Sequence, residues 1–292
     1  MLTFRQLCRR AAVALLVLSM AAPACAQPEL WVVKSQQATV YLFGTVHLLP
    51  ADTDWRYPTL DRALAASDSL TIELTDDNPA NMQALVMQYG IDPTHPLSDQ
   101  LSTDENKSLA KAAETAGIPG GTQTLNIMRP WLAALTLAIA PLVKAGLDPA
   151  NGVDKLLQAQ MVKAGKPVNG LETTEQQIRF LSDLPPGLQL DFLKSTLRDV
   201  DKDSNELIGL ISAWKAGDTD AIARLEDDDV RKESPELYET LIVDRNKVWA
   251  TKIAALLQHP GTVFIAVGAA HLAGPDSVQA QLAKLGIATQ TR

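Results

Sequence analysis

The chain has 292 residues, of which 46% are hydrophobic and 21% are charged, the balance of an ordinary globular protein. Its formal net charge of −8 argues against nucleic-acid binding, and 5% aromatic residues are too few for base-stacking platforms. The longest apolar segment beyond the N-terminus, residues 131–143, is shorter than the ~20 residues that a membrane-spanning helix needs. We therefore expect no nucleic-acid partner and no membrane span in the mature chain.

The first 26 residues have the order of a secretory signal peptide. Three arginines precede an apolar run over residues 11–20, and Ala24-Cys25-Ala26 forms a small-x-small cleavage site. We expect cleavage after Ala26 and a periplasmic or secreted chain that begins at Gln27. The alternative is a lipoprotein signal acylated at Cys25, although alanine stands where that motif prefers leucine. Cleavage would remove both cysteines, so any metal would be bound by His, Asp, Glu or carbonyl oxygen.

Short β-branched runs alternate with longer segments of helical period along the rest of the chain. We predict strands at residues 31–34, 38–43, 69–73, 166–171, 262–267 and 288–290. We predict helices at residues 57–66, 80–89, 104–116, 130–143, 153–164, 174–182, 187–200, 205–215, 219–227, 235–257 and 275–285. Interleaved strands and helices predict an α/β fold with a mixed, partly parallel central sheet and flanking helices. Residues 27–292 would form one domain, with a large helical insertion at about 78–165.

Local signals support several of these boundaries. Pro130, Pro235 and Pro275 suit the first turn of a helix. Thr174 followed by Gln177 fits a capping box at the start of another helix. The acidic run at residues 226–229 is interpreted as a solvated face.

Two histidines follow predicted strands in matched settings. His47 comes three residues after Gly44, and His271 comes three residues after Gly268; each glycine ends an apolar strand. In open α/β sheets, ligands bind outside the carboxyl ends of the strands. A single histidine of this kind is usually structural, whereas two matched G-x-x-H units indicate a shared site.

Two carboxylates occupy similar positions. Glu73 ends the predicted strand at 69–73, and Glu172 follows the one at 166–171. If these strands are parallel neighbours, both side chains reach the cleft that holds His47 and His271. The alternative is that each glutamate faces solvent in a loop.

The predicted helix over residues 235–257 carries two polar residues on its apolar stripe. Arg245 and Asn246 both lie one turn from Ile242 and from Trp249. A buried arginine needs an anionic partner, so the pattern predicts that Arg245 points into the acidic cleft or forms a structural ion pair. Arg129 is a weaker candidate of the same kind, whereas His95 and His259 are expected in turns without a role.

Several common catalytic motifs are absent from the sequence. It contains no G-x-S-x-G elbow, no G-x-x-x-x-G-K-[ST] loop, no G-x-G-x-x-G and no H-E-x-x-H. Serine-hydrolase, nucleotide-binding and zincin functions therefore have no support.

The chain resembles the TraB/GumN family, which includes PrgY and the Tiki metalloproteases. The resemblance rests on residues 42–50, 72–74, 129–131, 152–154, 170–176, 245–246 and 267–274, which occur in the family's order. It implies an α/β fold related to ChaN and to erythromycin-esterase-like proteins. From the Tiki branch it also implies metal-dependent peptide hydrolysis, with His47, Glu73 and His271 in the roles of the two histidines and the glutamate.

Two imidazoles and one carboxylate are a common first shell for a catalytic metal ion with an open position for water. Such a set suits Zn²⁺, Mn²⁺ or Co²⁺ and does not choose among them. Glu172 could accept the proton of the water, and Arg245 with Asn246 could stabilise an oxyanion. The hypothesis is an exported metallohydrolase of peptide bonds, with a peptide or small-molecule substrate. The alternatives are a non-enzymatic peptide-binding or sequestering protein and metal-free acid/base hydrolysis in the same cleft.

Overall fold

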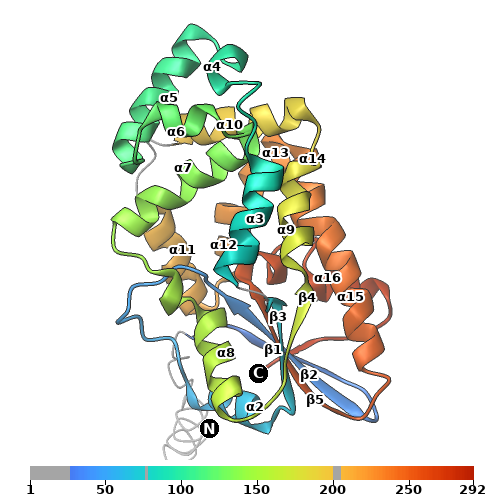
Figure 1. The fold of residues 1–292 in the computed structure, drawn as a ribbon. Helices are drawn as coiled ribbons and strands as arrows, with labels where there is room; N and C mark the ends of the chain where they lie inside the picture. Colours follow the sequence, from blue (N-terminus) through green and yellow to red (C-terminus); the bar gives the residue numbers. More distant parts are fainter. Residues whose placement is uncertain (1–26, 76–77, 200–204) are drawn as a thin grey trace, which may run out of the picture.

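One mixed sheet organises the part of the chain that the structure describes, residues 27–75, 78–199 and 205–292 of a computed structural model (Figure 1). The strands are β1 (Leu30–Lys34), β2 (Ala38–Thr45), β3 (Ser69–Leu74), β4 (Val168–Glu172), β5 (Gly261–Gly268) and β6 (Gln290–Thr291). The predicted signal peptide, with its cleavage and acylation positions, lies outside the described residues. Within them, no helix is both long enough and apolar enough to cross a bilayer.

The sheet order β4-β3-β5-β2-β1-β6 confirms the predicted mixed, partly parallel α/β fold. Strands β4, β3, β5 and β2 are parallel, whereas β1 runs antiparallel to both β2 and β6. In register, Thr45 of β2 pairs with Gly268 of β5, and Leu74 of β3 pairs with Glu172 of β4. The carboxyl ends of four parallel strands therefore lie along one edge of the sheet.

Helices cover both faces of the sheet and extend beyond its carboxyl edge. They are α2 (Pro58–Ala66), α3 (Pro79–Gly90), α4 (Leu97–Gln100), α5 (Thr103–Ala116), α6 (Thr122–Asn126), α7 (Pro130–Lys144), α8 (Val153–Lys163), α9 (Thr174–Ser182), α10 (Pro186–Asp199), α11 (Asn205–Ala216), α12 (Thr219–Glu226), α13 (Asp228–Glu233), α14 (Pro235–Tyr238), α15 (Asp244–Leu256) and α16 (Val278–Lys284). Short 3-10 turns lie at η1 (Pro149–Asn151) and η3 (Ala269–Leu272), and a π-helical segment lies at η2 (Glu239–Val243).

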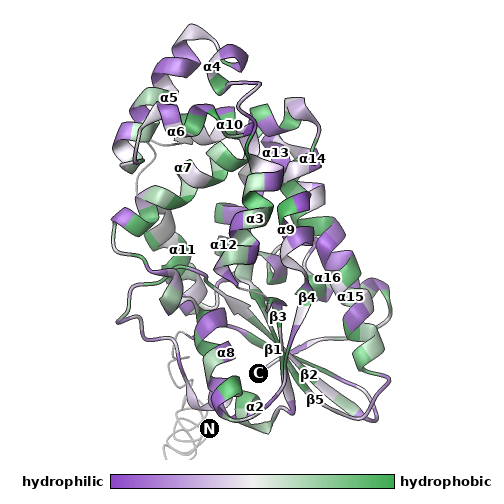
Figure 2. Ribbon diagram, in the orientation of Figure 1, coloured by the Kyte–Doolittle hydropathy of each residue, from purple (hydrophilic) through white to green (hydrophobic). Residues whose placement is uncertain are grey.

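Successive residues of the central strands face two separate hydrophobic cores, as the period of two in a strand requires. Phe43 of β2 and Phe264 of β5 pack against α2, α8, α11 and α12, whereas Leu42 and Ile265 pack against α15 and α16. Figure 2 shows the hydrophobic colouring along these strands. The close approach of η3 to β2 depends on Gly44, because a Cβ there would stand 3.2 Å from Ala269 Cα.

A third core belongs to a helical unit beyond the carboxyl ends of the strands, drawn at the top of Figure 1. It joins α5, α6 and α7 to Leu193 of α10, a helix from much later in the chain. The predicted insertion at about 78–165 spans α3 to α8. Helix α8, however, packs against the sheet through Val153, Leu157 and Met161.

The structure corrects three local predictions. The expected single helix over residues 235–257 is divided into α14, η2 and α15. Helix α16 begins at Val278 with Ser277 as its N-cap, so Pro275 precedes the helix. The capping box of α9 is formed by Thr173 and Gln176, one residue earlier than predicted, and this leaves Gln177 out of the cap. The sequence pattern also gave no sign of α4, α6 and α13, each of six residues or fewer.

The acidic run at residues 226–229 is not wholly a solvated face. Asp227, at the junction of α12 and α13, is only 3% exposed. None of the described groups hydrogen-bonds its Oδ2, which stands 3.5 Å from the position of a Cβ at Gly274. Burial, together with the charges of Glu226, Asp228 and Asp276, raises the pKa of Asp227 to about 7, although Arg231 opposes the shift.

Substituting Asp227→Asn should flatten the pH dependence of stability. Because the pKa of Asp227 is higher in the folded chain than in the unfolded chain, its stabilising contribution is full at pH 4 and is lost as the pH rises through 7. Between pH 4 and 8 the wild type should lose about 2–4 kcal/mol of unfolding free energy more than the variant, measured by urea denaturation. Asp220→Asn, in the first turn of α12, is the exposed control. If the unfolding free energies of wild type and Asp227→Asn changed with pH in parallel, the raised pKa of Asp227 would be contradicted.

Candidate functional site

The predicted polar residues gather at the carboxyl edge of the parallel strands, where Gly268 is their common neighbour. A Cβ at position 268 would stand 3.2 Å from Glu73 Oε1 and 3.6 Å from both His47 Nε2 and His271 Cδ2. Only glycine leaves this space to the three side chains. The order of the strands therefore brings together residues that are more than 200 positions apart in the sequence.

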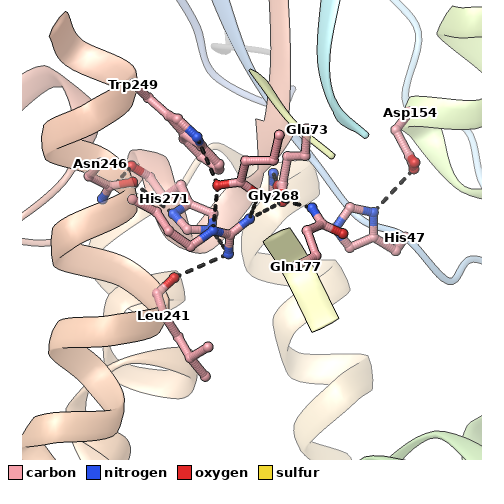
Figure 3. A network of polar contacts seen from close by, with 11 residues as sticks. His47, Glu73, Asp154, Gln177, Leu241, Asn246, Trp249, Gly268 and His271 are labelled. Atoms are coloured by element: carbon pink, nitrogen blue, oxygen red, sulfur yellow. Dashed lines mark hydrogen bonds and ion pairs between the residues drawn. The ribbon is translucent and has the colours of Figure 1, made fainter. Parts of the chain in front are cut away.

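Arg245 forms the centre of the site and joins its two acidic strand ends (Figure 3). Its Nε and Nη2 donate to the two oxygens of Glu172 at 2.8 and 2.9 Å, and Nη2 also donates to Glu73 Oε2 at 2.6 Å. The side chain is only 12% exposed. A buried guanidinium requires such anionic partners, so the sequence-based expectation of an acidic partner for Arg245 holds with both carboxylates.

Aromatic rings and a π-helical turn complete the surroundings of Arg245. Its Cζ lies 4.7 Å from the ring centre of Trp249 and 5.4 Å from that of Phe180. Its Nη1 donates to the carbonyl of Leu241, in the π-helical segment η2 immediately before α15. Such segments are frequent at functional sites, and this one directly precedes the helix that carries Arg245.

Glu172 has all of its acceptor positions occupied. Besides the two hydrogen bonds from Arg245, Oε1 accepts from Trp249 Nε1 at 2.9 Å and Oε2 accepts from Gln177 Nε2 at 3.1 Å. A carboxylate offers about four lone-pair positions, so the one that the sequence suggested as a proton acceptor is committed to holding Arg245.

His271 is held as a neutral imidazole. It is only 4% exposed, and its ring centre lies 4.4 Å from that of Trp249. Its Nε2 lies 3.0 Å from Arg245 Nη1, which can only donate, so Nδ1 carries the proton and donates to Asn246 Oδ1 at 2.7 Å. Burial, which outweighs the attraction of Glu73, lowers the pKa of His271 to about 3. Asn246 is fixed in turn, because its Nδ2 donates to the carbonyl of Asp276 at 2.9 Å.

His47 has the opposite charge state. Its side chain is 56% exposed, and Nδ1 lies 3.2 Å from Asp154 Oδ1 at the start of α8. Removal from water lowers the pKa of His47, but the hydrogen bond to Asp154 and the charge of Glu73 outweigh this and raise it to about 9. His47 is therefore an imidazolium at neutral pH, with Nε2–H on the side of Gly268 and Glu73.

Glu73 is ionised between the two histidines. Its Oε1 accepts from the Gly268 N–H at 2.6 Å. Burial opposes ionisation, yet the positive charges of His271 when protonated, of Arg245 and of His47, with the Gly268 N–H, lower the pKa of Glu73 to about 2. Glu73 therefore remains a carboxylate across the neutral pH range.

A cavity of about 290 Å³ opens in front of these groups, and we call it the strand-end cavity. Its lining includes His47, Glu73, Leu74, Asp154, Lys155 and Gln177. Glu172 and Arg245 do not line the cavity but contact Gln177 and Glu73, which do. The cavity is small and combines charged and amide groups with the apolar side chains of Leu74, Pro149 and Ala266.

The nitrogen and oxygen donors of the site bear on whether it can hold a divalent metal ion. His47 and His271 each present Nδ1 to a fixed oxygen, of Asp154 or Asn246, which is the usual support of a metal-binding imidazole. The nitrogen and oxygen donors thus fit a metal chemically. In their present arrangement these donors do not form a metal site, because the lone pair of His271 Nε2 already accepts a hydrogen bond from Arg245 Nη1. Within the described ranges, no group of three His, Cys, Asp or Glu has metal-binding geometry. The predicted metal held by His47, Glu73 and His271 remains a prediction.

Sequence reasoning gave no role to two residues of the site. Asp154 belongs to the stretch 152–154 that carries the resemblance, but its pairing with His47 depends on where α8 packs. Gln177 was assigned to a helix cap instead of the cavity. Arg129 lies elsewhere, at the N-cap of α7, and donates to the carbonyls of Tyr89 and Ser182, so it joins the start of α7 to α3 and α9.

Comparison with known proteins places the chain among relatives of unknown activity. The sequence model of the TraB/PrgY/gumN family matches residues 29–291. A relative described as "Uncharacterized protein YbaP" from Escherichia coli (strain K12) is 29% identical over 251 residues, which cover 83% of this chain and 87% of the relative. A protein of the same description from Shigella flexneri matches to the same extent. No solved structure matches the chain significantly.

Replacing Arg245 by Met should destabilise the fold by about 3–5 kcal/mol, because Glu172 would be left buried without a counter-charge and Glu73 would keep only that of His47. Urea denaturation at pH 7 measures the loss. Adding Glu73→Gln and Glu172→Gln should recover part of it, since no charge then remains unpaired. Arg179→Met is the matched control: its ion pair with Asp183 is about half exposed, and its loss should cost at most about 1 kcal/mol. Equal losses for the two arginine variants would contradict the central role of Arg245.

Proposed function

Since the chain belongs to the TraB/PrgY/gumN family, we propose that it is an exported, metal-dependent hydrolase that cleaves peptide bonds in the strand-end cavity. The observation that supports this most is the pair of histidines, each with Nδ1 fixed by an oxygen and each beside the ionised Glu73. His47, Glu73 and His271 would hold the ion, which when bound would acidify a water molecule and polarise the substrate carbonyl. The ion is Zn²⁺, Mn²⁺ or Co²⁺ by its nitrogen and oxygen donors.

The residues of the chain would divide the remaining work. Asp154 and Asn246 orient the two imidazoles, and Glu73 is the carboxylate that faces the cavity. Arg245 lies beside Glu73 and places a positive charge where negative charge would develop on the carbonyl oxygen. In the reaction, the water oxygen bonds to the carbonyl carbon, the C–N bond breaks, and the nitrogen leaves with a proton.

Glu172 takes a different role in this proposal from the one suggested by the sequence. Both oxygens of Glu172 already accept hydrogen bonds, from Arg245, Trp249 and Gln177. Glu172 is therefore a positioning residue that holds Arg245. The hydrogen bond between Arg245 and His271 also favours a second candidate, metal-free acid/base hydrolysis by the Glu/His set. A peptide-binding protein without turnover would use the same cavity.

Metal analysis combined with a peptide-library cleavage assay tests the proposal. The wild type should carry a stoichiometric divalent ion and cleave peptides, and chelation should abolish cleavage. His47→Ala should remove metal and turnover together while the fold survives, because it lies at the exposed end of a strand. His259→Ala, exposed and outside the site, should change neither.

The other outcomes separate the alternatives. Cleavage that survives chelation would replace the metal proposal by acid/base hydrolysis with the same residues. Peptide binding without turnover would replace hydrolysis by sequestration. Full cleavage by His47→Ala would exclude the strand-end cavity as the active site.

The proposed export rests on the order of charge, apolar run and cleavage site in residues 1–26. Protein recovered from the periplasm or the medium should begin at Gln27, as N-terminal sequencing or intact mass would show. An acylated N-terminus at Cys25 would identify the lipoprotein alternative. Intact Met1 in the cytosol under normal expression would contradict export.

A further inference from the structure

Gln177 is the one amide side chain among the cavity residues described above, and its position is fixed from two sides. It lies on α9 between the Arg245 network and His47, and it is half-buried (Figure 3). The neighbouring Gln176 makes the capping box with Thr173, so Gln177 is not needed to begin the helix. Ile178, the next residue, is buried against Trp131 and Leu132 and anchors α9. The capping box and the buried Ile178 therefore hold the first turn of α9, which carries Gln177, in place.

The orientation of the Gln177 amide follows from its contact with Glu172. Its Nε2 lies 3.1 Å from Glu172 Oε2, and an ionised carboxylate can only accept hydrogen bonds. The NH₂ group must therefore face Glu172, and the carbonyl oxygen Oε1 is turned to the other side. Figure 3 shows that this other side is the side of His47. The site thus holds a preoriented hydrogen-bond acceptor at the wall of the strand-end cavity.

We propose that Gln177 Oε1 accepts an N–H of the bound substrate and makes the cavity select peptide amides over the matching esters. This inference rests on the proposed function. An ester in the same position would set its oxygen against Oε1, so that two acceptors would face each other without a proton between them. The wall is half-exposed and water can enter, so we expect discrimination of about 10-fold, at the lower end of the range for an unpaired buried acceptor.

The test uses a peptide library in which every member has depsipeptide twins, each with one backbone N–H replaced by oxygen. Wild type, Gln177→Leu and Gln176→Leu are compared by mass spectrometry at equal protein concentration. Gln176→Leu is the matched control, because it removes only one of the two capping-box hydrogen bonds of α9, keeps the one to Thr173 Oγ1, and does not alter the lining of the cavity.

The wild type and Gln176→Leu should cleave peptides about 10-fold faster than their twins at one backbone position other than the cleaved bond, because an ester at the cleaved bond is intrinsically more reactive and is left out of the comparison. In Gln177→Leu this ratio should fall to about 1, whatever the overall rate. A residue that only orients Glu172 would change the rate and leave the ratio intact, so an unchanged ratio in Gln177→Leu would overturn the proposal.

Failure of the proposed hydrolysis is recognisable separately. If the wild type cleaves no member of the library, the same library is used in equilibrium dialysis. Preferential retention of peptides over twins by wild type, lost in Gln177→Leu, supports the selecting role without turnover. Equal retention, or no retention at all, overturns it.

Discussion

The buried charge of Arg245 constrains the rest of the site. Its guanidinium donates to Glu73, to Glu172 and to the carbonyl of Leu241. A charge at 12% exposure is tolerable only if these partners assemble with it, so β3, β4 and α15 must come together in one arrangement. The parallel order of the strands makes this possible, because it brings Glu73 and Glu172 to the same edge. The polar site therefore forms only when α15 packs on the sheet, and this packing in turn requires the two carboxylates to pair with Arg245.

The same guanidinium makes the two histidines unequal, although their sequence settings are nearly identical. His271 accepts from Arg245 and is buried, so it stays neutral, whereas His47 faces Asp154 and the cavity and is charged at neutral pH. Glu73 lies between an uncharged and a charged imidazole. A ligand entering the cavity therefore meets an imidazolium and a carboxylate side by side, and a neutral imidazole lies behind them.

The sequence predicted the strands and the polar residues at their ends, because each of these depends on short-range patterns. An apolar run that ends in glycine before His47 or His271 is visible within nine residues. The hydrogen-bond partners of these residues could not be predicted, since they depend on where the helices dock. Asp154 reaches His47 only because α8 packs on the sheet. The π-helical segment, the shift of the capping box to Thr173 and the burial of Asp227 likewise result from tertiary packing that overrides local signals.

The Nε2 lone pair of His271 decides between the two chemistries that this site can support. It can accept the hydrogen bond of Arg245 Nη1 or coordinate an ion, but not both. The guanidinium is planar and rigid, so Nη1 cannot move away from His271 without also shifting Nε and Nη2 relative to Glu172. An ion bound there would therefore cost that hydrogen bond and would meet the repulsion of a fixed positive charge. Under the proposed function, binding of an ion and the position of Arg245 would be coupled through the contact between Arg245 and His271.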